Sequence, residues 1–247
     1  GSEWIGLDNF KRLFSSYWFP IILKNTLTLS LLSLILGFPL PIILALLLNE
    51  VSNGHFRKTF QTVSYAPHFI STVVMTLFLN PTSGIFNIII TKLGGESVNF
   101  LQDPANFKWI YVLSAVWQEM GWGSIIYFAT LSGVDRSLLE AAEIDGANRF
   151  QKIWYINVPV LIPTIIILLI LQCGSLLSVG YEKVYLLQNT TNLSGSEVIS
   201  TYVYKVGLEQ ADFSFGAAAD LFNSVINSTI LILANFIAKR TTDQGLF

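Results

Sequence analysis

The residues best suited to binding a small polar molecule lie together in the middle of a long apolar segment. In the run from Trp117 to Trp122, two aromatic rings flank Gln118 and Glu119. Sugar C–H groups stack on flat aromatic faces, while sugar hydroxyls bond to amides or carboxylates. Polar groups within an apolar span are costly and tend to face a cavity. The run therefore predicts a substrate pathway, although helix packing, with Gly121 at a close contact and Glu119 bonded to a neighbour, explains it too.

For four further polar residues the same two interpretations are open, namely contact with a substrate or helix packing. Asn223 and Asn227 are four residues apart, so they share one face of a helix. Tyr181 follows an apolar segment, where an ordinary polar loop is at least as good an interpretation. The fourth residue is Gln172, within the same segment.

Residue sets typical of catalysis or metal binding are missing from the sequence. His55 and His68 are isolated and flank no carboxylate cluster, and the lone Cys173 provides neither a disulfide nor a metal site. There is no Ser/His/Asp or Cys/His set, and no G-x-x-x-x-G-K-[ST] phosphate loop. We therefore expect no enzymatic activity, no bound cofactor and no metal in this chain.

A polar, helix-prone loop over 132–159 is the second candidate site. Asp135 or Ser137 can cap a helix that begins near Leu138, and Ser137 and Glu140 have the spacing of a capping box, with Glu140 in the first turn. Gly146 can end that helix or allow close backbone approach.

Two interpretations of this loop remain open. It is either a solvated helix that joins two spans, or a docking helix whose acidic groups pair with a basic partner. Pro159 is expected to begin the following span, where its missing N–H costs little.

Composition places these residues in a membrane protein. Hydrophobic residues make up 52% of the chain and charged residues 12%, whereas soluble domains carry about 25% charged residues. The net charge of −2 gives no reason to expect nucleic-acid binding. Spanning helices need about 20 apolar residues, and five spans are expected, near 21–48, 62–80, 108–131, 160–179 and 217–238. The first should be kinked by Gly37, Pro39 and Pro41.

Charge sets the expected orientation of these spans. Lys and Arg divide seven against seven between the two sides, so their number decides nothing. They are denser on the side that holds the loop 132–159, which favours that side as cytoplasmic.

Glu140-Ala141-Ala142, Gly146, Ile156 and Pro159 together resemble the EAA loop of ABC-importer permeases, with Val158 where Leu is usual. Flanking segments are similar to the oligosaccharide and polysaccharide branch of these permeases, and the resemblance covers nearly the whole chain. Those segments are Trp4–Phe10, Asn25–Leu27, Gly180–Asn189 and Ser200–Leu208. Such subunits usually have a sixth span before the first of these segments, so we expect this chain to be a fragment.

The resemblance implies an all-α polytopic membrane helix bundle with the type I ABC-importer permease fold. It implies an interfacial segment over 1–20, a transmembrane permease domain over 21–238 and a cytoplasmic tail over 239–247. It assigns coupling to ATPase subunits to six residues of the loop 132–159: Glu140, Ala141, Ala142, Asp145, Gly146 and Pro159.

The resemblance also implies partners. These are a second permease subunit in a heterodimer, two ATPase subunits that bind ATP and Mg, an external solute-binding protein and an oligosaccharide, in a bacterial plasma membrane. A type I importer for another solute, such as an amino acid or phosphate, is an alternative, and a secondary transporter or channel is a more distant one. Few basic residues lie in the expected spans, so an acidic oligosaccharide would need charge partners from elsewhere.

Overall fold

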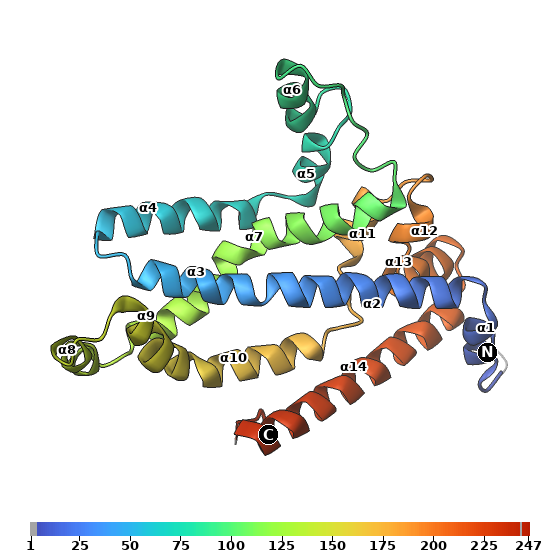
Figure 1. The fold of residues 1–247 in the computed structure, drawn as a ribbon. Coiled ribbons are helices and arrows are strands. Elements are labelled where there is room, and N and C mark those ends of the chain that lie inside the picture. Colours follow the sequence, from blue (N-terminus) through green and yellow to red (C-terminus); the bar gives the residue numbers. More distant parts are fainter. Residues whose placement is uncertain (1–3, 243) are drawn as a thin grey trace. The chain divides into compact units, whose positions relative to one another are not determined.

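The computed structural model describes residues 4–242 and 244–247, and throughout these residues the regular structure is helical (Figure 1). The chain divides into two compact units. The first unit comprises the described residues up to 32, together with 71–114 and 173–232. The second unit comprises 33–70, 115–172 and the described residues from 233 onward.

In the described part of the chain the helices follow one another closely, and the α-helices alternate with two π-helical turns and one 3₁₀ turn (η). In the first half they are α1 Asp8–Ser15, α2 Trp18–Gly37, α3 Pro39–Asn49, α4 Gly54–Tyr65, η1 Ala66–Phe69, α5 Thr72–Phe78, α6 Ile85–Lys92 and α7 Pro104–Ser132. In the second half they are α8 Arg136–Ile144, α9 Arg149–Lys152, η2 Ile153–Asn157, α10 Val158–Cys173, α11 Tyr181–Leu187, α12 Leu193–Ser196, α13 Ile199–Tyr204, η3 Lys205–Glu209 and α14 Phe213–Thr242.

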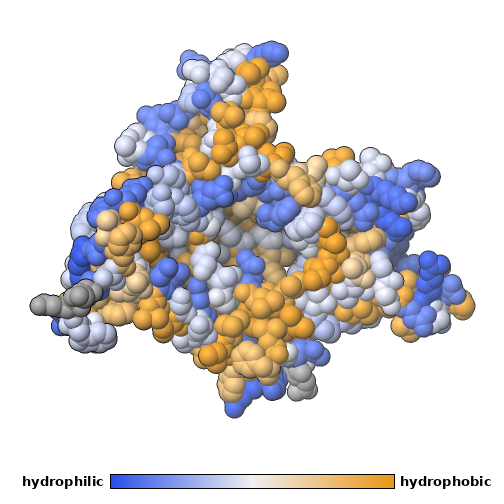
Figure 2. Space-filling model, turned by 180° about the vertical axis from the view of Figure 1, so that it is seen from behind, coloured by the Kyte–Doolittle hydropathy of each residue, from blue (hydrophilic) through white to orange (hydrophobic). Residues whose placement is uncertain are grey.

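Three of the described helical segments are long and apolar enough to cross a membrane, namely Trp18–Asn49, Arg149–Cys173 and Phe213–Thr242. Only 11% to 22% of the most apolar window of each is buried within the chain. Apolar residues accordingly cover much of the face shown in Figure 2. Surfaces of this kind need lipid or another protein to cover them.

The five expected spans agree with the helices of the structure to different degrees. The first and fifth lie within apolar helices, and Gly37 and Pro39 mark the expected interruption between α2 and α3. The third lies within the continuous, 29-residue α7, which is not among the three described segments that are long and apolar enough to cross a membrane. The fourth begins earlier and ends earlier than expected, since the helix runs from Arg149 to Cys173. The last helix also continues to Thr242, into the expected tail.

The second expected span, 62–80, is wrong as a single helix. Pro67 lies in the 3₁₀ turn η1, and Ile70 is extended, with φ −82° and ψ 120°. Helix α5 then starts afresh, because the Ser71 side chain caps it by accepting a hydrogen bond from the Val74 N–H. Proline interrupts helical hydrogen bonding, and the hydropathy of this segment did not reveal the break.

Each unit has its own apolar core. In the first, buried Leu13 of α1 packs with Val206, Phe215 and Ala219. In the second, Ala45 of α3, Tyr127 and Leu131 of α7, and Leu161 of α10 pack together. The second core therefore joins α3 to α7, which carries one candidate site, and to α10, which adjoins the other.

Candidate functional site

The loop 132–159 folds around a short helix, α8, whose start differs from the expected one. The Asp135 side chain accepts a hydrogen bond from the Ser137 N–H at 2.9 Å, so α8 begins at Arg136. This bond lowers the pKa of the Asp135 carboxyl below its ordinary value. The expected capping box between Ser137 and Glu140 is therefore wrong, and Glu140 lies beyond the first turn.

The end of α8 explains the motif's glycine. Gly146 has φ +78°, a left-handed conformation that side chains other than glycine adopt at a cost. The Ala147 N–H donates to the Ala142 carbonyl at 2.9 Å, and the Gly146 N–H donates to the Glu143 carbonyl at 3.0 Å. These two bonds form a Schellman motif. The expectation that Gly146 ends the helix is confirmed.

Charge and capping hold the segment after α8 in place. The Lys152 Nζ lies 2.6 Å from the Glu143 Oε1, and this hydrogen bond lowers the pKa of Glu143 below its ordinary value. A reciprocal pair between Asn148 and Gln151 caps α9. Pro159 does not begin a helix as expected, because the helix already runs from Arg149 through the π-helical turn η2.

The outer surface of this segment is open. Ile144 is 87% exposed and Phe150 84%, and Glu140, Ala141 and Asp145 are exposed as well. An ideal Cβ at Gly146 would meet no atom of the chain within 4 Å. The segment therefore combines a fixed backbone with an acidic and apolar exposed surface, as a docking element requires.

The polar centre of α7 packs against the break after α4. Gln118 is 8% exposed, and its Nε2 donates to the Ile70 carbonyl at 2.7 Å. It thereby satisfies a backbone group that the break leaves without a helical partner. At Gly121 an ideal Cβ would lie 1.9 Å from the Ser64 carbonyl oxygen, so the glycine permits close helix packing. The packing interpretation accounts for these two residues.

Glu119 and Trp122 form an exposed cluster with His68, a residue that the sequence predicts to be isolated. The His68 Nδ1 lies 3.2 Å from both carboxylate oxygens of Glu119. The His68 ring stacks on Trp122, with centroids 4.4 Å apart and planes 3° apart. Trp117 and Trp122 are 42% and 43% exposed. Since Pro67 and His68 lie far from α7 in sequence, no local signal indicated this contact.

Three of the remaining pathway candidates lie in the first unit, and Gln172 belongs to the second. Asn227 accepts a hydrogen bond from the Leu177 N–H and donates to the Ser178 Oγ, both at 2.9 Å, and so fixes the chain after α10. The Oδ1 of Asn223 is buried and lacks a hydrogen-bond partner in the described part of the chain. Tyr181 packs against the rings of Tyr185 and Tyr204. Gln172, at the end of the second unit, is exposed.

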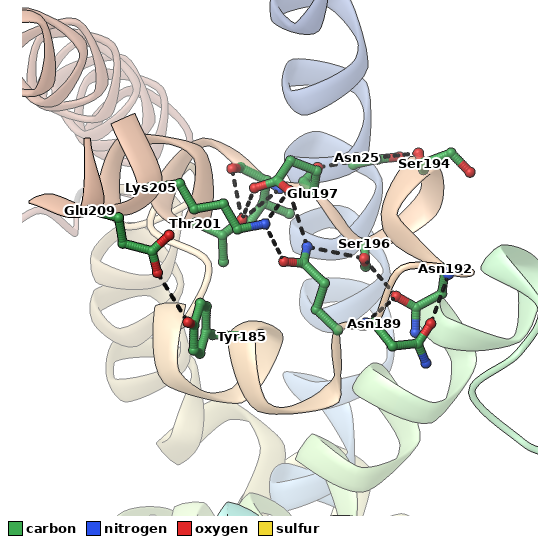
Figure 3. A network of polar contacts seen from close by, with 12 residues as sticks. Asn25, Tyr185, Asn189, Asn192, Ser194, Ser196, Glu197, Thr201, Lys205 and Glu209 are labelled. Atoms are coloured by element: carbon green, nitrogen blue, oxygen red, sulfur yellow. Dashed lines mark hydrogen bonds and ion pairs between the residues drawn. The ribbon is translucent and has the colours of Figure 1, made fainter. Parts of the chain in front are cut away.

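A buried polar network in the first unit was not anticipated (Figure 3). Lys205 donates to Glu197 at 2.6 Å and to Gln188 at 2.5 Å, and the side chain of Glu197 is only 4% exposed. Asn25 of α2 donates to the carbonyls of Ser194 and Glu197. Asn25 lies 169 and 172 residues from these two partners, so its contacts leave no local motif.

Within the described residues, no group of three or more His, Cys, Asp or Glu side chains could hold a metal ion. The candidate sites are the segment around α8 and the polar, aromatic clusters at α7 and in the first unit.

Comparison with known proteins gives consistent matches. Residues 37–243 match the family described as "Binding-protein-dependent transport system inner membrane component". The polygalacturonan/rhamnogalacturonan transport system permease protein YteP of Bacillus subtilis (strain 168) is 43% identical over all of this chain and 78% of its own length. Protein LplB of the same organism is also 43% identical, over all of this chain and 79% of its own.

Solved structures agree with these matches. The chain is similar to one chain in the crystal structure of a bacterial alginate ABC transporter in complex with an alginate pentasaccharide-bound periplasmic protein. The TM-score is 0.93 at 43% identity, over 98% of this chain and 85% of the other. A second structure, of a bacterial ABC transporter involved in the import of the acidic polysaccharide alginate, matches equally well over 86% of its chain.

Proposed function

Because the chain belongs to the family of binding-protein-dependent transport system inner membrane components, we propose that it is a permease subunit through which a bacterial ABC importer takes up an oligosaccharide. It forms the membrane pathway together with a second, different permease subunit and crosses the plasma membrane several times. An external solute-binding protein delivers the sugar, as the match to a transporter in complex with a periplasmic protein supports.

One observation carries the coupling part of this proposal, namely the exposed, doubly fixed helix α8. Asp135 fixes its start and Gly146 its end, while Ile144 and the acidic side chains remain open. A short rigid helix of this kind fits a cleft on an ATPase subunit, and its carboxylates pair with basic residues there. The sequence has no phosphate loop of its own, so two ATPase subunits supply the energy and bind ATP and Mg.

The mechanism follows from docking. ATP binding closes the ATPase pair and moves the coupling helices together, which favours the outward-open pathway, and hydrolysis resets it. A ligand shifts such an equilibrium only by its differential affinity for the two states, and rigid-body movement of packed helices is the usual response. The chain itself needs no catalytic group for this role.

The substrate pathway includes the cluster of His68, Glu119 and Trp122. An aromatic face beside a carboxylate suits the ring and hydroxyls of a sugar. Ionisable groups near the middle of a long helix in a membrane protein are typical of substrate pathways. Gln118 stabilises this site through its hydrogen bond to the Ile70 carbonyl, whereas Asn227 stabilises the chain after α10 by accepting a hydrogen bond from the Leu177 N–H.

We propose further that the sugar is acidic. One solved relative imports the acidic polysaccharide alginate, and YteP is named for polygalacturonan. Lys24, Lys108 and Lys183 of the first unit would supply positive charge for such a sugar, the first two near the ends of expected spans. The Lys183 Nζ lies 5.6 Å from the ring centroid of Tyr111, one turn from Lys108.

Docking is tested by co-purifying the ATPase subunit with the assembled importer. Ile144→Glu should release the ATPase and abolish uptake, because it places a charge on the exposed docking face. Leu93→Glu is a matched control, since Leu93 is 83% exposed at the end of α6. Retention of the ATPase by the Ile144→Glu importer would contradict the docking role.

Substrate class is tested by uptake into proteoliposomes that contain the complete importer. Labelled galacturonic acid trisaccharide should be taken up, and unlabelled alginate trisaccharide should compete better than a neutral arabinose trisaccharide. Stronger competition by the neutral trisaccharide would overturn the acidic assignment, and ATP-dependent uptake of no oligosaccharide at all would overturn the sugar assignment.

A further inference from the structure

The helix that follows α8 contains a widened turn with an identifiable cause. In η2 the Val158 N–H donates to the Ile153 carbonyl, five residues back, as in a π-helix. Pro159 follows at once, and in a regular α-helix its ring would crowd the carbonyl of Tyr155. The wider turn relieves this conflict, and π-turns are frequent at functional sites.

The widened turn places Asn157 in the interior of the second unit. Its side chain is 0% exposed, and its Nδ2 donates to the Glu50 Oε1 at 3.4 Å. Glu50 directly follows the last residue of α3. The Oδ1 of Asn157 is also buried, and it has no partner among the residues that the structure describes. A buried acceptor atom without a hydrogen bond is destabilising, so something other than stability must account for the presence of Asn157 at this site.

These contacts complete a continuous path from α8 to α3. Glu143 of α8 pairs with Lys152 at 2.6 Å. From Lys152, the last residue of α9, the helix continues without a break through η2 to Asn157, which contacts Glu50. Every member of the path lies in the second unit. Coupling between sites travels through packed and hydrogen-bonded networks of this kind when an element has two arrangements.

We infer that Asn157 and Glu50 are positioning residues that transmit movement of α8 to α3. Because the Oδ1 of Asn157 has no hydrogen-bond donor among the described residues in this arrangement, the side chain can exchange partners when the segment moves. This inference rests on the proposed function, because it takes α8 as the element that the ATPase drives. The contact lies outside the six coupling residues that the EAA resemblance assigns.

The test compares ATP hydrolysed per sugar transported in the reconstituted importer. Asn157→Asp places two carboxylates face to face and should raise this ratio about 2- to 30-fold, the range expected for residues along a coupling path. Glu50→Gln preserves an acceptor and should leave the ratio near wild type. The double variant Asn157→Asp/Glu50→Gln restores a hydrogen bond with donor and acceptor exchanged, and should return the ratio to near wild type.

A matched control separates coupling from loss of structure. Asn87 is 2% exposed, and its amide bonds to backbone groups of Asn80 and Val98 in the first unit. Asn87→Leu should lower the yield of the complex without changing the ratio. An Asn157→Asp importer with an unchanged ratio, or a double variant that is not rescued, would overturn the inference.

The proposed function is tested in parallel with Ile144→Glu. If that variant keeps its ATPase, the docking role of α8 in the proposed function fails. If it loses the ATPase while Asn157→Asp keeps a normal ratio, only the present inference fails.

Discussion

The backbone N–H of Ala147 donates to the carbonyl of Ala142 at 2.9 Å, across the left-handed residue Gly146. The bond sets the spacing between the motif's second alanine and its glycine. In a Schellman motif the left-handed residue stands four positions after the residue whose carbonyl accepts this bond. The EAA spacing is therefore a helix-ending geometry, in addition to any contact with a partner.

Gly146→Val should uncouple uptake from ATP hydrolysis, because a β-branched residue resists the φ of +78°. A left-handed conformation costs ordinary L-residues about 1–2 kcal/mol. Gly146→Asn is the control, since asparagine tolerates this conformation and no atom of the chain lies within 4 Å of the new Cβ. The ATPase activity and uptake of both variants are measured. Equal loss of coupling in both would show that bulk at the docking surface matters, not the backbone conformation.

Acid should loosen the junction between α8 and α9. Hydrogen bonding to Lys152 lowers the pKa of Glu143 in the folded state, so the pair stabilises the junction above the ordinary pKa of about 4.3. That contribution is lost as the pH falls through the lower, folded-state value. Hydrogen exchange at 143–152, corrected for its intrinsic pH dependence, should lose protection in this range. Lys152→Met should abolish this pH dependence, and an unaltered profile would contradict the role of the pair.

Gln118 and Glu119 are adjacent but should respond differently to substitution. Gln118→Met leaves the Ile70 carbonyl without its 2.7 Å hydrogen bond, and should lower the stability of the importer by about 1–3 kcal/mol. Glu119→Gln changes a side chain that is 61% exposed, and should alter stability by less than about 0.5 kcal/mol. It should nevertheless raise the KM for uptake. Thermal unfolding and uptake kinetics measure the two effects, and an unchanged KM would remove Glu119 from the pathway.

Lys205→Met should be strongly destabilising. It leaves the Glu197 carboxylate, 4% exposed, without its ion pair, and breaking a buried pair by removing one partner costs about 3–5 kcal/mol. Lys24→Met, at an exposed lysine of α2, is the control. The melting temperatures of the two variants in detergent are compared. A Lys205→Met importer as stable as the control would show that Glu197 has another compensating partner.

Local patterns in the sequence predicted the long helices and the end of α8. Apolar runs located α2, α3, α10 and α14 because hydropathy needs no knowledge of neighbours, and Gly146 marked a helix end for the same reason. The contacts of His68, Asn157 and Asn25 escaped prediction because each depends on a partner distant in sequence. The break at Ile70 was missed although Pro67 was visible, since apolar composition alone does not distinguish a continuous helix from two short ones.

The amide of Asn227 has a consequence for protein engineering. From α14 it forms hydrogen bonds with Leu177 and Ser178. Asn25 of α2 likewise forms hydrogen bonds with Ser194 and Glu197. The stretch 174–209 is therefore not a self-contained module, because part of its conformation is specified by two helices outside it. A chimaera that grafts this stretch from a relative must transfer compatible residues at 25 and 227, or the graft will lack its anchors.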